Sequence, residues 1–166
     1  MSKKLIVLVG NIGCGKSTIA QDYVKDGYVA IVRDQLRYAI GDGQYVFNRD
    51  YESIIWKTEQ YMLRKFLELG ANIIVDEVGV SKKLRKKYIK VGKEFDYSVE
   101  AIVLPRLSMK EAVSRRMKNP HGQFDKKLWE QVWTNFDKMY RDPTHEEGFD
   151  SILRLKGDMN DNKILS

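Results

Sequence analysis

The sequence predicts an α/β fold: a three-layer, P-loop NTPase-type parallel sheet with helices on both faces and a short helical lid. First, apolar segments of strand length alternate with segments of helical spacing, which is typical of a parallel sheet covered by helices. Second, a glycine-rich loop with the spacing of a phosphate-binding loop, residues 10–17, directly follows the first apolar segment. We therefore expect a single domain over residues 1–166, with its lid at about 108–126.

Each predicted element follows from the composition of its segment. Short apolar runs predict strands at about 4–9, 28–32, 71–76, 99–104 and 149–155. Apolar residues at helical spacing predict helices at about 16–25, 34–40, 50–69, 81–95, 108–117 and 126–140. Ser108 and Glu111 have the spacing of a capping box, which supports a helix that begins there.

Two of the predicted helices carry apolar or aromatic side chains at helical spacing. In the helix at about 50–69 these are Ile54, Ile55, Met62, Phe66 and Leu67. In the helix at about 126–140 they are Trp129, Trp133, Phe136 and Tyr140. Because the second set keeps a helical period, we expect it to form a core stripe rather than a surface on which bases stack.

The loop G-x-x-x-x-G-K-S predicts a binding site for a nucleoside triphosphate. Small residues let backbone N–H groups curl around the phosphates, and the helix that follows directs its positive N-terminal end at them. Lys16 would reach the β- and γ-phosphates, and Ser17 would offer its hydroxyl to a magnesium ion. The expected cofactors are therefore ATP and Mg²⁺, and the expected loop ligands are Gly10, Gly13, Cys14, Gly15, Lys16, Ser17 and Thr18.

Two aspartates stand where predicted strands end, Asp34 after 28–32 and Asp76 at the end of 71–76. Ligands of an open α/β sheet lie beyond the carboxyl ends of its strands, so both carboxylates should face the phosphate loop. Asp76 is expected to hold the magnesium ion and its waters, with ordinary helix capping as the alternative. Asp34 fits a base that orients and deprotonates an acceptor hydroxyl, and it fits the N-cap of the next helix equally well.

Composition and charge limit the classes of protein that the chain can belong to. With 166 residues, 43% of them hydrophobic, the chain can fill one core. It has no apolar run long enough for a membrane span and no secretory signal, so we expect a soluble, cytoplasmic protein. The net charge of +6 favours anionic partners. Basic residues crowd 82–93, where a solvated helix face and a nucleic-acid surface both explain them.

Several segments carry a resemblance to a known family. Residues 32–37, VRDQLR, resemble the R-D-x-x-R acceptor motif of phage-type 5′-polynucleotide kinases. Residues 74–76 with the basic helix that follows resemble the third-strand aspartate region of that family, and residues 111–115 resemble its lid. Residues 136–149 resemble the Pro-Thr-x-x-Glu-Gly-Phe ending of animal DNA end-repair kinases. The resemblance thus spans nearly the whole chain.

The resemblance implies a role for each matching residue. Lys16 and Ser17 would hold the triphosphate and the metal, and Asp34 would act as general base on the acceptor hydroxyl. Arg37 would steady the acceptor phosphate, with a surface arginine as the alternative. Arg115, on the lid, would cover the donor phosphates, and closure of the lid would exclude water.

The chain also departs from the family pattern. After the third-strand aspartate it has Glu77, where the family usually continues with threonine or asparagine, and this carboxylate could touch a metal, a sugar hydroxyl or a base edge. A second lid arginine is replaced by Asn119, for which Arg116 or Lys118 could substitute. His121 and His145 lack metal-ligand spacing and are expected to be loop residues.

We expect an ATP-dependent kinase whose acceptor is a hydroxyl of a nucleic acid, with the 5′-OH end as the leading choice. A free nucleoside or nucleotide, or a hydroxymethylated base in DNA, is an alternative acceptor for the same machinery. A nucleotide-dependent regulatory ATPase or switch is a further alternative. The aromatic residues Tyr45 and Phe47 lie between Asp34 and Asp76 in sequence, so they could flank the acceptor.

Overall fold

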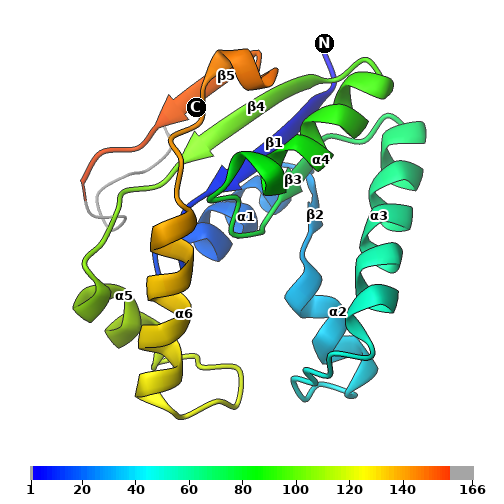
Figure 1. Ribbon diagram of the computed structural model, residues 1–166. Helices are drawn as coiled ribbons and strands as arrows, with labels where there is room; N and C mark the ends of the chain where they lie inside the picture. Colours follow the sequence, from blue (N-terminus) through cyan, green and yellow to red (C-terminus); the bar gives the residue numbers. More distant parts are fainter. Residues whose placement is uncertain (1, 158–166) are drawn as a thin grey trace.

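The computed structural model describes residues 2–157 and is built on a five-stranded sheet in which every strand pair is parallel (Figure 1). The order of the strands across the sheet is β2-β3-β1-β4-β5. Their bounds are β1 Lys4–Val9, β2 Val29–Ile31, β3 Ile73–Val75, β4 Ser98–Val103 and β5 Ser151–Arg154. The first strand therefore lies at the centre of the sheet, and the chain winds outward from it in both directions.

The helices lie between the strands along the chain, as the alternating pattern predicted. They are α1 Lys16–Lys25, α2 Arg33–Ile40, α3 Glu52–Glu68, α4 Lys82–Glu94, α5 Met109–Arg116 and α6 Lys126–Met139, followed by a 3₁₀ turn at His145–Glu147. Each predicted helix and strand is present, with ends within two residues of those expected. Among the described residues, no helix combines the length and the apolar character needed to cross a bilayer.

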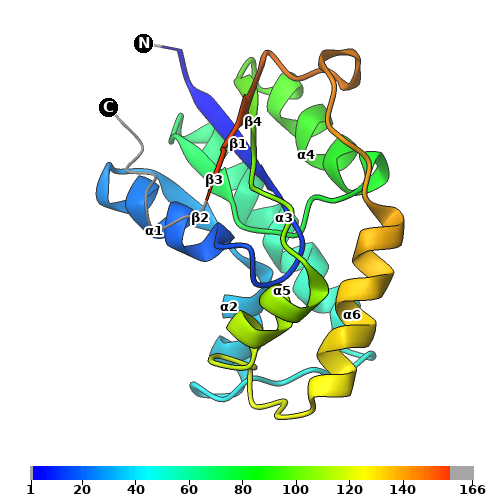
Figure 2. The same cartoon turned by 90° about the vertical axis from the view of Figure 1, so that its left-hand side faces the viewer.

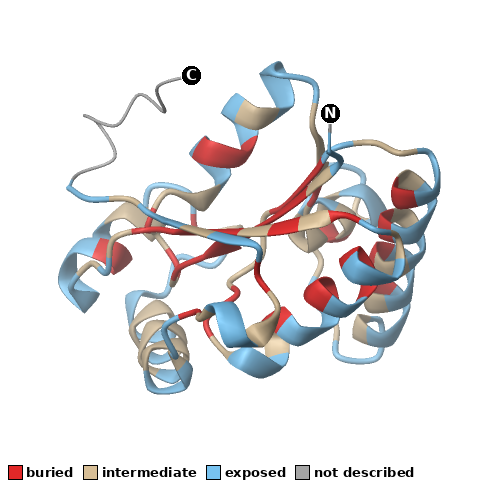
Figure 3. Ribbon diagram, turned by 90° about the horizontal axis from the view of Figure 1, so that it is seen from above, coloured by how far each residue is buried: buried red, intermediate tan, exposed pale blue. Residues whose placement is uncertain are grey.

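Alternate side chains of the central strand supply two separate hydrophobic cores, because successive residues of a strand point to opposite faces. Leu5, Val7 and Val9 pack on one face with side chains of α3 and α4, including Leu63 and Ile89. On the other face, a smaller core joins side chains of the sheet to those of α1. Figures 2 and 3 show the resulting three layers, with the buried strands between helices on both sides. The predicted fold class is confirmed.

The structure shows which faces of α3 and α6 are buried, and one prediction about them needs correction. In α3, Ile54 is 64% exposed, whereas its neighbour Ile55 is 3% exposed and faces the core with Leu63 and Leu67. Helical spacing does not tell which of two adjacent apolar residues faces inward. The predicted core stripe of α6 is wrong, because no residue of this helix is buried. Figure 1 shows the reason: α6 lies below the sheet beside α5 rather than against a face of the sheet.

A buried ion pair joins α4 to the segment that precedes β5. The Arg85 side chain is fully buried, and it donates two hydrogen bonds to the Glu147 carboxylate, at 2.9 and 2.6 Å. The same guanidinium donates to the carbonyl oxygens of Gly79 and Arg141, both at 2.9 Å. Gly148 follows with φ of 112°, a left-handed conformation that favours glycine. The Glu-Gly-Phe ending therefore has a structural role in this chain: its Glu147 binds Arg85 and fixes the ending to α4. We call this ion pair the Arg85–Glu147 clasp.

Removal of one charge from this clasp should destabilise the fold. In Glu147→Gln the buried Arg85 guanidinium loses its counter-charge, which typically costs about 3 kcal/mol or more. We expect the free energy of unfolding in urea to fall by about that amount. Asp22→Asn, which breaks the exposed pair of Asp22 with Lys25, is the control and should leave the midpoint unchanged. An equal, small effect of both changes would contradict the clasp.

Candidate phosphoryl-transfer site

The phosphate loop leaves β1 at Val9 and turns into α1 through two glycines. Gly13 has φ of 70° and Gly15 has φ of 100°, so both lie in the left-handed region. A Cβ at Gly13 would stand 2.2 Å from the carbonyl oxygen of Ala112 in α5. Both glycines therefore allow the loop to curve, and Gly13 also allows α5 to approach the loop closely.

Side chains of the loop hold its shape from within. The Lys16 ammonium donates to the carbonyl oxygens of Gly10 and Asn11, at 3.0 and 2.7 Å. The Asn11 side chain accepts from the backbone of Ile12 at 2.7 Å and donates to the carbonyl of Trp133 in α6 at 2.9 Å. The loop is thus tied to α6 as well as to its own lysine.

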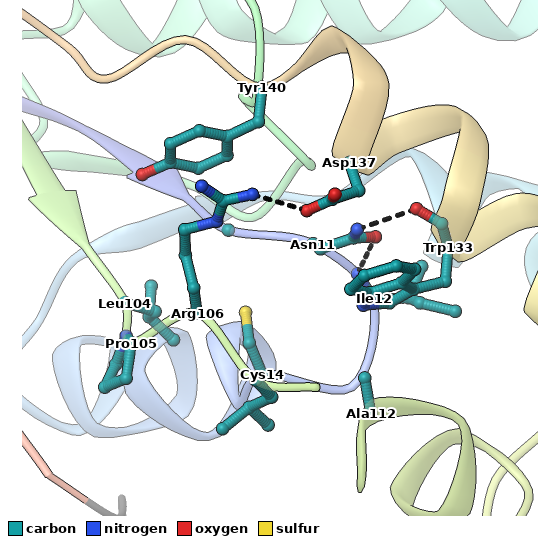
Figure 4. A pocket seen from close by; sticks show the side chains of 12 residues that line it. Asn11, Ile12, Cys14, Leu104, Pro105, Arg106, Ala112, Trp133, Asp137 and Tyr140 are labelled. Carbon is teal, nitrogen blue, oxygen red and sulfur yellow. Dashed lines mark hydrogen bonds and ion pairs between the residues drawn. The ribbon is translucent and has the colours of Figure 1, made fainter. Parts of the chain in front are cut away.

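A small cavity of about 10 Å³ lies behind the phosphate loop (Figure 4). Cys14 lines it and is 3% exposed. Arg106 pairs with Asp137 of α6 at 2.6 Å and lies over the Tyr140 ring, 4.5 Å from its centre. This volume holds about one water molecule. The cavity lies where α6 packs against the phosphate loop, and it is too small for a ligand.

Ser17, in the first turn of α1, and Asp76, which follows β3, line the same cleft. Burial raises the pKa of Asp76, while the Ser17 hydrogen bond and the charge of Lys16 oppose that rise. No cluster of three or more metal-ligating side chains exists in the described part of the chain. One hydroxyl and one carboxylate fit Mg²⁺, which is usually held by few protein ligands together with phosphates and waters.

An open cleft of about 1030 Å³ extends from the phosphate loop to α2. Its walls include most of the predicted site residues: Gly13, Gly15, Lys16, Ser17, Thr18, Asp34, Asp76 and Arg115. Arg116, Lys118 and Asn119 also line it, so both candidate replacements for the second lid arginine face the same space. Gly10 and Cys14 line the small cavity instead.

Asp34 lines this cleft from the first turn of α2. Its Oδ1 accepts hydrogen bonds from Arg37 at 2.6 Å and from the Tyr45 hydroxyl at 2.9 Å. Burial, reinforced by the charge of Asp34, raises the pKa of Tyr45, so this phenol stays protonated and donates. No side-chain cap hydrogen bond is made at the N-terminus of α2. The alternative role of Asp34 as an N-cap is therefore wrong, because the N-cap residue of α2 is Val32.

Arg37 is enclosed by carboxylates and aromatic rings. Besides Asp34, it binds both oxygens of Glu52, at 2.9 and 2.6 Å, and only 9% of the residue is exposed. The rings of Tyr45 and Phe47 lie 5.9 and 5.7 Å from its guanidinium. These contacts orient Asp34. The predicted contact of Arg37 with an acceptor phosphate would require Glu52 to move.

His121, expected to be an ordinary loop residue, lies in the cleft next to Asp34. Its Nε2 is 2.7 Å from a guanidinium nitrogen of Arg116, and its Nδ1 is 2.7 Å from the Tyr38 hydroxyl. The ring stacks on Tyr45, with centroids 4.8 Å apart. Arginine only donates, so Nε2 is the acceptor and His121 is neutral. No signal in the sequence identified this residue, although Tyr45 was expected near the acceptor.

Glu77 faces the cleft from the end of β3 and anchors the start of α2. Its carboxylate accepts from the backbone N–H of Arg33 at 2.7 Å. The Arg33 side chain turns away from the cleft to bind Glu59 at 2.9 Å, and Tyr88 donates to Glu59 at 2.8 Å. Burial raises the pKa of Glu77 to about 7. The residue that departs from the family pattern thus fixes the backbone next to Asp34.

Residues 5–142 match the family described as an AAA domain. A curated relative, L-seryl-tRNA(Sec) kinase of Methanococcus maripaludis, is 24% identical over 177 residues, 97% of this chain and 68% of the relative. A structure of the Pnkp1/Rnl/Hen1 complex matches with a TM-score of 0.59 and 26% identity, over 69% of this chain and 39% of that one.

A structure of the Pnkp1/Rnl/Hen1 RNA repair complex matches with a TM-score of 0.67 and 23% identity, over 99% of this chain and 51% of that one. This chain therefore spans about half, or less, of those two chains. Mycobacterium tuberculosis APS kinase, with AMPPNP and APS, has a TM-score of 0.58 at 15% identity, over 92% and 88% of the two chains. Together the matches confirm the resemblance to P-loop polynucleotide kinases and support a kinase-type phosphotransferase.

Substitution of Gly13 should weaken nucleotide binding for a steric reason. In Gly13→Ala the new methyl group collides with Ala112, so either the loop or α5 must move. Gly27→Ala is the matched control, because Gly27 has φ of 89° but open space around its Cβ position. Both variants carry the strain of a left-handed alanine, about 1 kcal/mol. We expect calorimetric titration with an ATP analogue to show lost affinity in Gly13→Ala alone.

The environment of His121 should make the fold sensitive to acid. Burial lowers the pKa of His121 in the folded protein. In the unfolded chain the pKa of this histidine returns to its ordinary value of about 6.5. Acidification through that range therefore favours the unfolded state. The free energy of unfolding should fall more steeply between about pH 7 and pH 5 in the wild type than in His121→Gln. Parallel pH curves for the two proteins would contradict a neutral His121 in the folded protein.

Proposed function

Because this chain belongs to the AAA domain family, we propose that it is an ATP-dependent kinase that phosphorylates a hydroxyl of a nucleic acid, with the 5′-OH end as acceptor. One observation carries the proposal. Asp34 and the phosphate-loop residues Lys16 and Ser17 line the same cleft. A base and a triphosphate cradle in one cleft suit in-line transfer from a bound donor to an acceptor.

In the proposed reaction, the acceptor hydroxyl oxygen forms a bond to the γ-phosphorus while the bond from that phosphorus to the β–γ bridging oxygen breaks. The hydroxyl proton passes to Asp34, and ADP leaves with the bridging oxygen. Arg37 and Tyr45 hold the Asp34 carboxylate by its Oδ1, and Oδ2, which lies 3.6 Å from Nε2 of His121, would accept the proton. Asp34 is therefore held in one orientation before the acceptor arrives.

Ser17 and Asp76 would hold the magnesium ion, which neutralises charge on the β- and γ-phosphates when bound. Lys16 would leave the loop carbonyls for the same phosphates. Arg115 would cover the donor from the lid segment at about 108–126, where it now contacts Glu111 at 2.9 Å. The buried Nε of Arg116 has no hydrogen-bond partner among residues 2–157, which suits a second arginine that turns to the transferred group.

The relatives and the charge of the chain support a nucleic acid as the acceptor. The names of the matching proteins include an RNA repair complex and a tRNA-linked kinase, and the net charge is +6. The cleft is open to solvent, so a strand can leave it. The APS kinase likeness and the carboxylate of Glu77 favour the second candidate, a small acceptor such as a free nucleoside or nucleotide.

The decisive test is transfer of label from γ-labelled ATP. The panel holds 5′-OH DNA and RNA oligonucleotides, DNA with a hydroxymethylated base, and free nucleosides and nucleotides. We expect label on the oligonucleotide 5′-end. Label confined to a modified base or a small molecule would mean that this molecule, and not the 5′-end, is the acceptor. ATP binding without any transfer would favour a regulatory ATPase.

Two variants assign the chemistry. Asp34→Asn removes the proposed base but keeps the phosphate cradle, so kcat should fall by about 10² to 10⁴ while the affinity for ATP stays close to that of the wild type. Lys16→Ala should lose both transfer and tight nucleotide binding. Transfer by Asp34→Asn at the wild-type rate would remove Asp34 from the mechanism.

A further inference from the structure

Helix α4 presents a row of lysines to solvent. Its buried side chains are Arg85, Tyr88, Ile89, Val91 and Gly92. Lys83, Lys87 and Lys90 are exposed and follow one another at intervals of four and three, so they lie along one side of the helix. We call these three residues the lysine stripe. Its geometry gives a continuous line of positive charge on the surface.

The lysine stripe connects to the acceptor side of the cleft through one aromatic side chain. The Lys87 ammonium lies over the Trp56 ring, 4.1 Å from its centre, and the Arg33 guanidinium is 5.1 Å from the same centre. Arg33 directly precedes Asp34, the proposed base. Cations and an aromatic ring thus lie together from α4 to the start of α2.

Few carboxylates in the described part of the chain pair with the lysine stripe. Of its three members, only Lys90 has a carboxylate partner in the described part of the chain, Glu94 at 4.0 Å. The neighbouring Lys82 and Lys86 are exposed as well and add charge along one side of the stripe. Because isolated ammonium groups at a surface attract phosphates, this face is complementary to a polyanion.

We infer that the lysine stripe binds the single-stranded part of a polynucleotide acceptor that extends beyond its reacting 5′-end. This inference rests on the proposed function and adds where the strand runs. The reacting hydroxyl lies at Asp34, and the following phosphates pass Trp56 toward Lys87 and Lys83. The flexible ammonium of Lys87 can exchange its contact with the ring for a phosphate, and the ring is then available to a base.

The test compares a double variant, Lys83→Gln/Lys87→Gln, with a control that loses the same charge at exposed pairs elsewhere, Lys25→Gln/Lys65→Gln. Binding of a 12-nucleotide, 3′-labelled strand with a free 5′-OH is measured by fluorescence anisotropy over a salt series. KM is measured for this strand and for a dinucleotide. Loss of two phosphate contacts should weaken 12-mer binding roughly 25-fold at about 0.1 M salt and reduce the salt slope by about 1.4.

The outcomes separate the inference from the proposed function. A higher KM for the 12-mer but not for the dinucleotide, in the stripe variant alone, supports the lysine stripe. Equal KM values in wild type, stripe variant and control, with transfer intact, would contradict strand binding by the lysine stripe. The proposed kinase activity would remain supported. Lysine-dependent binding without any transfer would support the surface and overturn the function. Competition by polyglutamate as strong as by unlabelled strand would overturn the assignment to nucleic acid.

Discussion

Parallel pairing of β1 with both β3 and β4 brings the carboxyl ends of the strands to one edge of the sheet, and the whole candidate site depends on it. Val7 pairs with Val75 on one side and Ala101 on the other. That register sets the phosphate loop after β1 beside Asp76 after β3. Because parallel strands need helical crossovers, the same pairing also determines that α1 and α4 cover opposite faces.

Charge balance then fixes the orientation of side chains at that edge. Arg33 and Asp34 are adjacent in sequence, yet one side chain turns to Glu59 and the other faces the cleft. Glu77 holds the backbone at Arg33 by accepting from its N–H. Each buried charge has a partner, which offsets the cost of removing it from water. An acidic residue at position 77 therefore has a structural reason here.

The contact between the two sides of the cleft depends on aromatic side chains as well as charge. His121, from the segment between α5 and α6, stacks on Tyr45, which follows α2. Arg116 lies over Trp129, 5.0 Å from the ring centre, and also binds His121. Because α6 packs beside α5 rather than in the core, its Trp129 is available for the contact with Arg116. A segment that closes over a donor would thereby also touch the proposed base.

The sequence by itself determined the fold class, the order of helices and strands, and the phosphate loop, because periodicity and glycine spacing are local properties of the chain. It also predicted that Asp34 and Asp76 face this loop, since strand ends share an edge. Tertiary structure alone decided the burial of Ile55 over Ile54, the Arg85–Glu147 clasp, the enclosure of Arg37 by Glu52, and the place of His121. These depend on contacts between residues far apart in sequence, such as the 83 positions that separate Tyr38 from His121, and no local pattern encodes them.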